Sequence, residues 1–506
     1  MKLAEQLRMM PFLRVFVVLT TGMLAARFIT APDGMIFLTA GIIYGAAWYF
    51  HRRPWGQSYL LAAIGMTGVV LSVLSDIPEN IPRGKRLALI VQIQESPVTQ
   101  GRWRRTTAHI GYFRSASTAD SISVHWQPSR EKIQLYVDTL YQIQAGETIS
   151  LFGYLNPIAP ASSSYGRLMR SRDLSARCYL TPGNFITRAP EATPTLSQRA
   201  ATLQQWAVER LSRLALNDTD RNLLITLLAG ERRSLDRTLR DEYARTGVSH
   251  ILSVSGLHMG FVFVLVNLLT AWIVMFRRGH LIRNGLVIIT LWIYAAMAGL
   301  SPPVIRAALM MTLAQLALGF SLRGDRYNLL LGAATLMLAI HPHYLSDISF
   351  QLSFLAVLSI LFLYPRLYRR RLSRIRWLDA LWSSLLLGVA AQIGTLPLVA
   401  YSFGNLPLIA VWINPPVVLC SFLVVSAGFL WLIFPLSWLA PILSRIIATM
   451  LHLQNTLIER ASQWSMAAID DLHPNGWLIV CIYFLLILLA IVWKLHEQSR
   501  QVLLKE

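Results

Sequence analysis

The sequence predicts a polytopic α-helical membrane protein with an inserted small all-β domain of the OB type. The 506 residues are 54% hydrophobic and 14% charged, with a mean hydropathy of +0.48, which is too apolar for an ordinary soluble protein. Apolar stretches long enough to cross a bilayer recur along the chain. Between them, residues 81–195 change to short alternating segments separated by Gly, Pro, Ser and Asp, as in a small barrel.

Four segments are expected in chain order. Transmembrane helices occupy 1–80, the OB-like domain 81–195, amphipathic connecting helices 196–242, and a larger membrane domain 243–506. Besides the central run that opens at Arg245, the expected spans are 11–26, 35–50, 59–74, 286–300, 304–320, 329–340, 350–363, 380–400 and 477–492. Residues 407–435 are broken by Asn414-Pro-Pro416, which is compatible with two helices or a re-entrant pair.

Loop charge sets the expected orientation. The short basic loop His51-Arg-Arg53 places the N-terminus in the cytoplasm by the positive-inside rule. The OB-like domain then lies on the periplasmic or extracellular side, and the C-terminus is expected in the cytoplasm. The protein is therefore expected in the inner, or cell, membrane as a multi-pass protein.

The OB-like domain carries more positive charge than topology requires. The net charge of the chain is +20, and 83–199 holds fifteen Lys or Arg against seven Asp or Glu. Its candidate DNA-binding residues interleave rings and cations, as a platform for a single strand would: Trp103, Arg104, Arg105, Tyr112, Phe113 and Arg114. The alternative is that half of the rings belong to the core and that the arginines form a solvated face.

Polar residues are dense in the stretch from Arg245 to Gly260, at the start of an apolar run that ends near Phe276. Such residues are costly at membrane depth unless they face protein or water. At helical spacing, one stripe holds Ser249, Ser253, Gly256 and Gly260, and a neighbouring stripe holds His250, Val254 and His258. The pattern indicates a small-residue packing face beside a histidine face.

This stretch also carries a resemblance. Gly230-Glu-Arg-Arg-Ser-Leu235, the approach from Tyr243 to Gly247, and His250-Ile-Leu-Ser-Val-Ser-Gly-Leu-His258 resemble the central motif of the ComEC family. These proteins are the inner-membrane DNA channels of natural transformation. Asp347 with Phe350-Gln-Leu-Ser353, and Gln392 with Thr395 and Pro397, are similar to further stretches of that family.

The resemblance implies a channel that conducts single-stranded DNA into the cytoplasm, with the barrel guiding the strand. A polyanion that crosses a low-dielectric core needs a polar or cationic lining. The candidate lining residues are His250, Ser253, Ser255, Gly256, His258, Gly260, Arg306, Gln351 and Gln392. The implied partners are single-stranded DNA, the lipid bilayer, a cytoplasmic motor or DNA-processing proteins, and a periplasmic DNA receptor; the oligomeric state stays open.

Enzyme activity, a metal and a cofactor are not expected. Ser255 and His258 lack a third acidic partner at readable spacing, and the phosphate-binding glycine motifs are missing. His341, His343 and Asp347 lack the further ligands of a two-metal site. The metallo-β-lactamase-like domain of many ComEC proteins is not expected after the last span. Two alternatives remain: a transporter of a smaller anion, and a membrane scaffold whose barrel binds a ligand.

Overall fold

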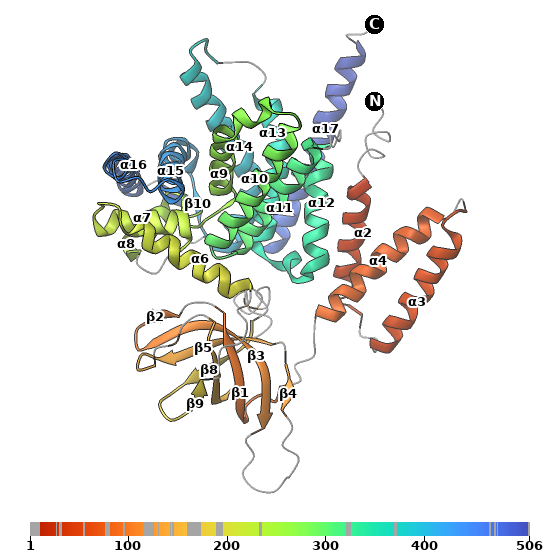
Figure 1. Ribbon diagram of the computed structural model, residues 1–506. Coiled ribbons are helices and arrows are strands. Elements are labelled where there is room, and N and C mark those ends of the chain that lie inside the picture. The colour runs from red at the N-terminus through yellow and green to blue at the C-terminus, as the bar shows by residue number, and fades with distance from the viewer. Residues whose placement is uncertain are drawn as a thin grey trace. The chain divides into compact units, whose positions relative to one another are not determined.

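The computed structural model describes most of the chain. The described residues are 11–26, 28–29, 33–53, 56–75, 81–94, 97–115, 126–129, 131–141, 143, 146–158, 169, 174–188, 196–231, 235–319, 325–368, 372–464, 467–469, 472 and 474–503. They form a mostly helical protein with one β-sheet domain near the N-terminus (Figure 1).

The chain divides into two compact units that do not follow its order. The first unit comprises Met1–Leu235, Ser253–Gln351 and Val424–Ile447. The second comprises Asp236–Leu252, Leu352–Leu423 and Ala448–Glu506. The division falls inside the central stretch, between Leu252 and Ser253.

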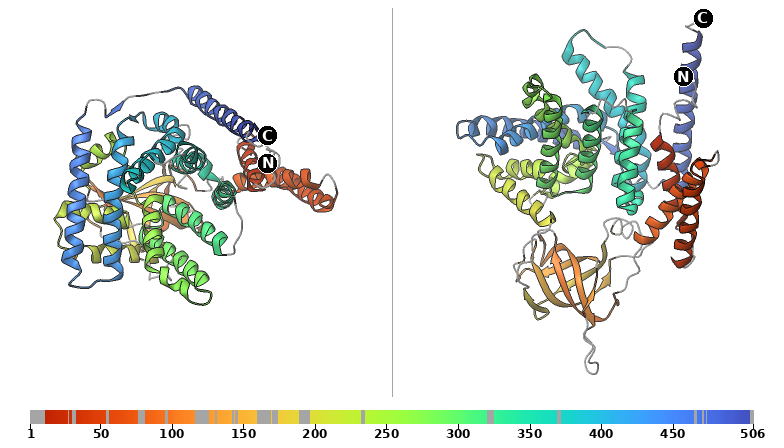
Figure 2. Two further views of the ribbon diagram at one scale, coloured as in Figure 1. Left: turned by 90° about the horizontal axis from the view of Figure 1, so that it is seen from above. Right: turned by 45° about the vertical axis from the view of Figure 1, so that its right-hand side comes forward.

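Three apolar helices come first among the described residues: α2 (Pro11–Ala26), α3 (Asp33–Phe50) and α4 (Gly56–Ser75), close to the predicted spans (Figure 2). Helices α2 and α4 lie in backbone contact, because a β-carbon at Gly22 would overlap the carbonyl oxygen of Gly65. One at Gly68 would overlap the carbonyl oxygen of Leu19. Close packing of this kind is how membrane helices associate without a hydrophobic driving force.

Nine strands of the described residues form one curved sheet in the order β7-β8-β5-β3-β1-β6-β9, with β2 and β4 paired to β3 (Figure 1). Their bounds are β1 (Arg86–Ile93), β2 (Val98–Gln100), β3 (Trp103–Ser115), β4 (Gln127–Pro128), β5 (Lys132–Asp138), β6 (Thr148–Tyr154), β7 (Asn156–Pro157), β8 (Leu174–Leu180) and β9 (Phe185–Arg188). The sheet curls into a half-barrel: a β-carbon at Gly153 of β6 would overlap the sulfur of Cys178 on β8.

Alternation in the sequence predicts five strands, at 87–94, 107–113, 122–126, 133–137 and 148–155. Four of them coincide with β1, β3, β5 and β6. The fifth, 122–126, lies outside the described residues except for Trp126. Strands β8 and β9 were not predicted, because Leu174–Leu180 carries Ser and Arg among its apolar residues and follows a long polar stretch.

Alternation along the strands builds the core of this domain. Leu87, Leu89, Val91 and Ile93 of β1 are fully buried, since successive side chains of a strand point to opposite faces. Inward residues of β3, β5, β6 and β8 belong to the same cluster. Each such side chain contributes about 1.5–3 kcal/mol through burial, so this face of the sheet forms the hydrophobic core of the domain.

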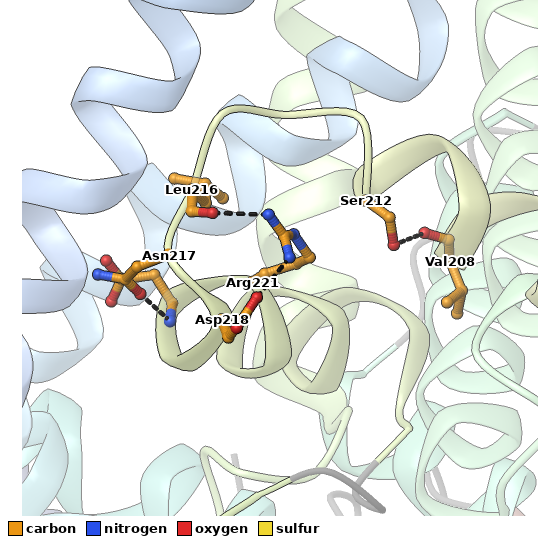
Figure 3. Close-up of polar contacts among 7 residues, drawn as sticks. Val208, Ser212, Leu216, Asn217, Asp218 and Arg221 are labelled. Atoms are coloured by element: carbon orange, nitrogen blue, oxygen red, sulfur yellow. Dashed lines mark hydrogen bonds and ion pairs between the residues drawn. The ribbon is translucent and has the colours of Figure 1, made fainter.

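Helices α6 (Leu196–Leu211) and α7 (Asp218–Ala229) follow the sheet, and the turn between them is held by polar contacts (Figure 3). Asn217 Oδ1 accepts the Asp220 N–H at 2.7 Å and caps α7. Arg221 reaches Asp218 Oδ1 through Nη1 and the Leu216 carbonyl through Nη2, both at 2.7 Å.

The amphipathic pattern of α6 predicts a helix at the membrane interface, with Arg210 among its apolar positions. The structure instead buries Ala207 and Leu211 against protein, in a helix that contacts α7 and α10 (Gly279–Met297). Arg210 lies with its Cζ 5.3 Å from the Trp206 ring centroid, and Trp431 Nε1 donates to its carbonyl at 2.9 Å. The cation is therefore accommodated by aromatic packing.

The remaining helices of the chain contain most of the apolar sequence. Their bounds are α8 (Arg237–Arg245), α9 (Gly256–Leu269), η1 (Ala271–Met275), α11 (Pro302–Gly319), α12 (Arg326–Ile340), η2 (Pro342–Ser346), α13 (Ile348–Leu367), α14 (Arg376–Phe403), α15 (Ala410–Ile433), α16 (Ala440–Ser462) and α17 (Gly476–Leu503). Six described helices are long and apolar enough to cross a membrane: α4, α10, α13, α14, α15 and α17.

One prediction about this region changes. Within residues 407–435, Ala410–Ile433 form one helix, α15, which runs through Pro415 and Pro416; they do not form a pair of helices. The turn Ser301-Pro-Pro303 lies between the predicted spans 286–300 and 304–320, as expected, because α10 ends at Met297 and α11 begins at Pro302. Proline is tolerated in a first helical turn, where its missing N–H would have no partner.

A buried polar chain joins three elements of the second unit. The Ser421 hydroxyl donates to Gln454 Oε1 at 3.1 Å, and Gln454 Nε2 donates to the Tyr243 hydroxyl at 2.9 Å. Tyr243 in turn donates to Asn455 Oδ1 at 2.9 Å. This chain ties α8 to α15 and α16 and fixes the start of the central stretch.

Candidate functional site

Helix α8 ends in a tight cap at the beginning of the central stretch. The Val248 N–H donates to the Tyr243 carbonyl at 2.9 Å, and the Gly247 N–H donates to the Ala244 carbonyl at 3.0 Å. This is the Schellman pattern, in which the residue after the cap adopts a left-handed conformation. Gly247 does so, with φ at +75°.

Gly247 is also in close contact with a later segment of the second unit. A β-carbon there would lie 2.6 Å from Cβ of Pro407 and 2.9 Å from Cβ of Ala410. Pro407 belongs to β10 (Leu406–Pro407), which pairs with β11 (Ala468–Ile469). Both the conformation and the space therefore require glycine at this position.

The chain after Gly247 is not helical, contrary to the helical stripes expected from spacing. Ile251 and Leu252 close a turn by donating to Val248 and Ser249, and α9 begins only at Gly256. Ser249 and Ser253 therefore do not share a helix face with Gly256. Nonhelical backbone at membrane depth occurs where protein or water satisfies it, so this unwound segment is a feature that spacing alone did not predict.

His258 has a structural contact at the start of α9. Ser255 is the N-cap: its Oγ accepts the Leu257 N–H at 3.3 Å, and its own N–H donates to His258 Nδ1 at 3.3 Å. This is a capping box with histidine in the position usually held by Glu or Gln. His258 is fully buried, and its Nδ1 accepts the N–H of the residue that caps α9.

Gly256 and Gly260 face α11 within the first unit. A β-carbon at Gly256 would lie 3.5 Å from Cβ of Ala307, and one at Gly260 would lie 3.9 Å from Cε of Met311. Both distances are ordinary van der Waals contacts. The small-residue face therefore exists, yet it leaves room for an additional methyl group.

Arg306 lies at the centre of a buried polar cluster in the first unit. It stands in the second turn of α11 and is 2% exposed. Its Nη2 donates to the Ser349 carbonyl at 3.0 Å and to the Ser349 hydroxyl at 2.8 Å. The first turn of α13 is thereby tied to α11, although the two helices are separated by α12.

The other two guanidinium nitrogens of Arg306, Nε and Nη1, are buried without a hydrogen-bond partner among the described residues. Asp347 interacts with the guanidinium electrostatically, while its Oδ1 accepts the Ser349 N–H at 2.8 Å and caps α13. A buried charged donor that lacks a partner is costly, by about 1–3 kcal/mol or more. Two of the three guanidinium nitrogens are thus left without a hydrogen-bond partner among the described residues.

Gln351, another predicted lining residue, belongs to the same cluster. Its Nε2 donates to the Leu345 carbonyl at 2.8 Å, which fixes the turn before α13. The cluster of Arg306, Asp347, Ser349 and Gln351 was only partly predicted, because Ser349 was not singled out. The sequence signal was the capping pattern Asp347-Ile-Ser349, an acid two residues before the serine at the start of an apolar run.

His250 and Gln392 belong to the second unit and are not part of that cluster. His250 is exposed, and its Nδ1 lies 3.2 Å from the Gly247 carbonyl oxygen. Gln392 is half-buried in the middle of α14. Ser253 and Ser255 are half-buried in the first unit. The predicted lining residues therefore form separate local groups.

The predicted DNA-binding residues of the sheet divide between its two faces. Trp103 and Arg105 project to the outer face, where Trp103 packs edge-on against Tyr179 with centroids 5.4 Å apart. Tyr179 stacks on Tyr136 at 4.8 Å. Arg104 points to the other side, at the end of the half-barrel, and donates to the Tyr141 carbonyl at 3.4 Å.

A second group follows along β3. Tyr112 is exposed, and Arg114 lies with its Cζ 5.5 Å from the ring centroid of Trp126. Phe113 between them is 4% exposed and belongs to the core cluster. Its prediction as a binding residue is wrong, because strand alternation turns it inward and its ring cannot stack on a base.

Comparison with known proteins agrees with the motifs. The family model described as Competence protein matches residues 227–496, more than half of the chain. An uncharacterized protein of Aquifex aeolicus (strain VF5) is 30% identical over 214 residues, which cover 42% of this chain and 48% of that protein. ComE operon protein 3 of Bacillus subtilis (strain 168) is 29% identical over 199 residues, 37% of this chain and 23% of that protein.

The chain thus spans about half of one curated relative and about a quarter of the other. No solved structure matches it. The matched family segment contains α8 to α16, with the central stretch and the Arg306 cluster. By this match and its agreement with the motifs, the chain is a member of the competence protein family, the ComEC family.

Proposed function

We propose that this chain is an inner-membrane channel that conducts single-stranded DNA into the cytoplasm during natural transformation. Membership of the competence family supports a role in DNA uptake. Six helices of membrane-spanning length and composition support a multi-pass location. Arg306 is the observation on which the proposal most depends.

Two nitrogens of the buried Arg306 guanidinium lack a hydrogen-bond partner among the described residues. Unpaired charged donors destabilise a protein core. The two donors gain partners when an anion binds during transport, because each passing phosphate accepts hydrogen bonds from those nitrogens. Arg306 is held by Ser349 through Nη2 alone, which leaves Nε and Nη1 for the phosphate. We therefore assign Arg306 as the cationic contact of the transported strand.

The proposal also includes an orientation and partners. The sheet domain faces the periplasm or the outside of the cell, where it guides the strand, and both termini lie in the cytoplasm. A cytoplasmic motor or DNA-processing protein pulls the strand, and a periplasmic receptor delivers it. The chain itself acts as a conduit and not as an enzyme.

A smaller anion is the second candidate substrate, favoured by the same observation. Arg306 near the first turn of α13 would suit inorganic phosphate as well as a phosphodiester. The two substrates differ in size and in the use of the sheet domain, because a small anion needs no extended binding face. A scaffold without a pore is the third candidate, and it assigns no substrate to Arg306.

The test is the import of labelled DNA from the periplasm into the cytoplasm of a deletion strain that carries the intact chain, Arg306→Gln or Arg306→Lys. We expect a loss of at least about tenfold for Arg306→Gln and a partial loss for Arg306→Lys, which keeps the charge but not the fork of donors. Arg277→Gln is the matched control, since Arg277 is exposed in a turn of the same unit.

Membrane levels of all variants are compared by immunoblot, so that a folding defect is not mistaken for a transport defect. Normal import by the deletion strain would contradict the channel. Normal import by Arg306→Gln, together with a loss of phosphate flux in proteoliposomes, would favour the small-anion transporter.

A further inference from the structure

The outer face of the sheet carries aromatic and cationic side chains side by side across β1, β3 and β6. Ala88 of β1 is the register partner of Arg114 on β3 and of Phe152 on β6. Paired residues of neighbouring strands project to the same face. Arg114 and Phe152 therefore lie on either side of a small alanine, about 10 Å apart at the usual strand spacing of about 4.8 Å.

Phe152 and Arg114 each form an arginine–ring pair with a further side chain. Arg86 lies with its Cζ 5.1 Å from the ring centroid of Phe152, and Arg114 lies 5.5 Å from that of Trp126. Tyr154 is the register partner of Arg86, so it extends the same face along β6. The result is two arginine–ring pairs joined by the alanine.

Tyr112 completes this surface. It pairs with Ile90, which lies two residues from Ala88 and so on the same side of β1. Tyr112, Trp126 and Tyr154 are 48%, 38% and 51% exposed. We call this surface the Arg86 face, and its members are Arg86, Tyr112, Arg114, Trp126, Phe152 and Tyr154.

The Arg86 face is chemically complementary to a polyanion that carries flat rings. Its charged members are both arginines, and none of the six is acidic. Exposed rings next to guanidinium groups suit a single strand, because bases stack on the rings while the arginines contact phosphates. A duplex keeps its bases inside and would use only the two arginines.

We propose that the Arg86 face binds single-stranded DNA by base stacking, independently of its sequence. The inference rests on the proposed function, because it gives the guiding step a location on this chain. The Trp103 group differs from it, since the rings of Trp103, Tyr136 and Tyr179 are already packed against one another. Capture of the strand is thereby assigned to the β1-β3-β6 side of the sheet.

The experiment measures the affinity of the full chain in nanodiscs for a fluorescent oligothymidylate by anisotropy, across a range of salt. The ring variants are Tyr112→Ala, Trp126→Ala and Tyr154→Ala, all at exposed positions where truncation should not unfold the domain. The cation variant combines Arg86→Gln with Arg114→Gln. The matched controls are Lys85→Gln, an exposed cation next to Arg86, and Leu140→Ala, an exposed apolar residue of the same domain.

We expect each ring variant to weaken binding about tenfold, as the removal of one stacked base does. The cation variant should reduce the slope of log affinity against log salt by about 1.4, or about 0.7 for each phosphate that an arginine no longer neutralises. Both controls should bind as the unmodified chain does. A duplex of the same length should bind more weakly and should be insensitive to the ring variants.

Ring variants that bind like the unmodified chain would overturn the assignment, and so would equal binding of the duplex. Absence of binding by the unmodified chain would overturn it too. None of these results bears on Arg306, whose role is measured by import into the cytoplasm. If import requires Arg306 while the ring variants bind normally, the channel stands and the Arg86 face is not its entry surface.

Discussion

Arg306 and Ser349 are joined by two hydrogen bonds from a single nitrogen: Nη2 lies 3.0 Å from the Ser349 carbonyl oxygen and 2.8 Å from its hydroxyl. The arrangement ties α11 to the first turn of α13 and leaves the rest of the guanidinium unused by the described residues. Ser349 therefore orients Arg306 without neutralising it. This distinguishes the pair from a buried salt bridge, in which the carboxylate would occupy the other nitrogens.

Replacing Ser349 with alanine should weaken this tie without breaking it. The hydroxyl bond to a charged donor is lost while the carbonyl bond remains, so we expect the free energy of unfolding to fall by about 1–2 kcal/mol. Thermal unfolding of the purified protein in detergent measures the change. Ser353→Ala, in the following turn of the same helix, is the control and should have little effect. An equal loss in both variants would show that the Ser349 hydroxyl stabilises the protein no more than the Ser353 hydroxyl does.

Gly247→Ala should be among the most damaging single-methyl changes in the chain. The left-handed backbone costs about 1 kcal/mol for a non-glycine residue, and the added β-carbon would crowd Pro407 and Ala410. We expect reduced folded protein and a lower unfolding temperature. Gly285→Ala is the matched control, because nothing lies within 4 Å of its β-carbon position in α10. That change should raise helix stability slightly, and a neutral Gly247→Ala would contradict the structure of the cap.

The contact between α2 and α4 predicts a similar contrast in the N-terminal helices. Gly22→Ala or Gly68→Ala should separate the two helices, since each β-carbon would overlap backbone atoms that cannot move alone. Gly45→Ala in α3 should be tolerated, because its β-carbon would meet open space. Limited proteolysis of the membrane-embedded protein and its thermal unfolding both report the loss. Equal stability of all three variants would argue against this packing.

Sequence patterns predicted the elements of this chain better than their contacts. Apolar length and alternation were sufficient to predict most of the apolar helices and four strands, because burial sets both patterns. They failed where local geometry overrides spacing. The stripe through Ser249, Ser253 and Gly256 assumed a helix that the cap at Gly247 ends. Phe113 was assigned to a binding face because its aromatic type was counted without its strand parity.

The candidate site shows the same limit. Arg306 was predicted as an unusual cation from its place in an apolar helix, whereas its partner Ser349 lies 43 residues away and has no pairwise signal in a single sequence. His258 was predicted as a polar lining residue, and its capping box with Ser255 is a local interaction that a helix assumption hides. Contacts of this kind depend on where helices begin, which spacing leaves uncertain by several residues.

Cys178 allows a prediction about pH in the sheet domain. Burial raises the pKa of its thiol to about 12, above an ordinary value of 9.0, and a weaker backbone hydrogen bond from Tyr179 opposes the shift. Between these values the unfolded chain loses a proton that the folded chain keeps. The contribution of Cys178 to stability is therefore complete below about pH 9 and declines as pH rises, by about 1.4 kcal/mol for each pH unit.

The measurement is denaturant unfolding of the purified protein between about pH 8 and about pH 10.5, a range that begins below the ordinary pKa of the thiol and ends below its raised value. Cys178→Ala should remove this part of the pH dependence, even though the smaller side chain lowers stability at every pH. Cys481→Ala is the control, because that thiol is exposed and should leave the slope unchanged. If Cys178→Ala keeps the slope of the unmodified chain, the alkaline loss of stability comes from other groups, and the thiol between β6 and β8 is not the titrating site.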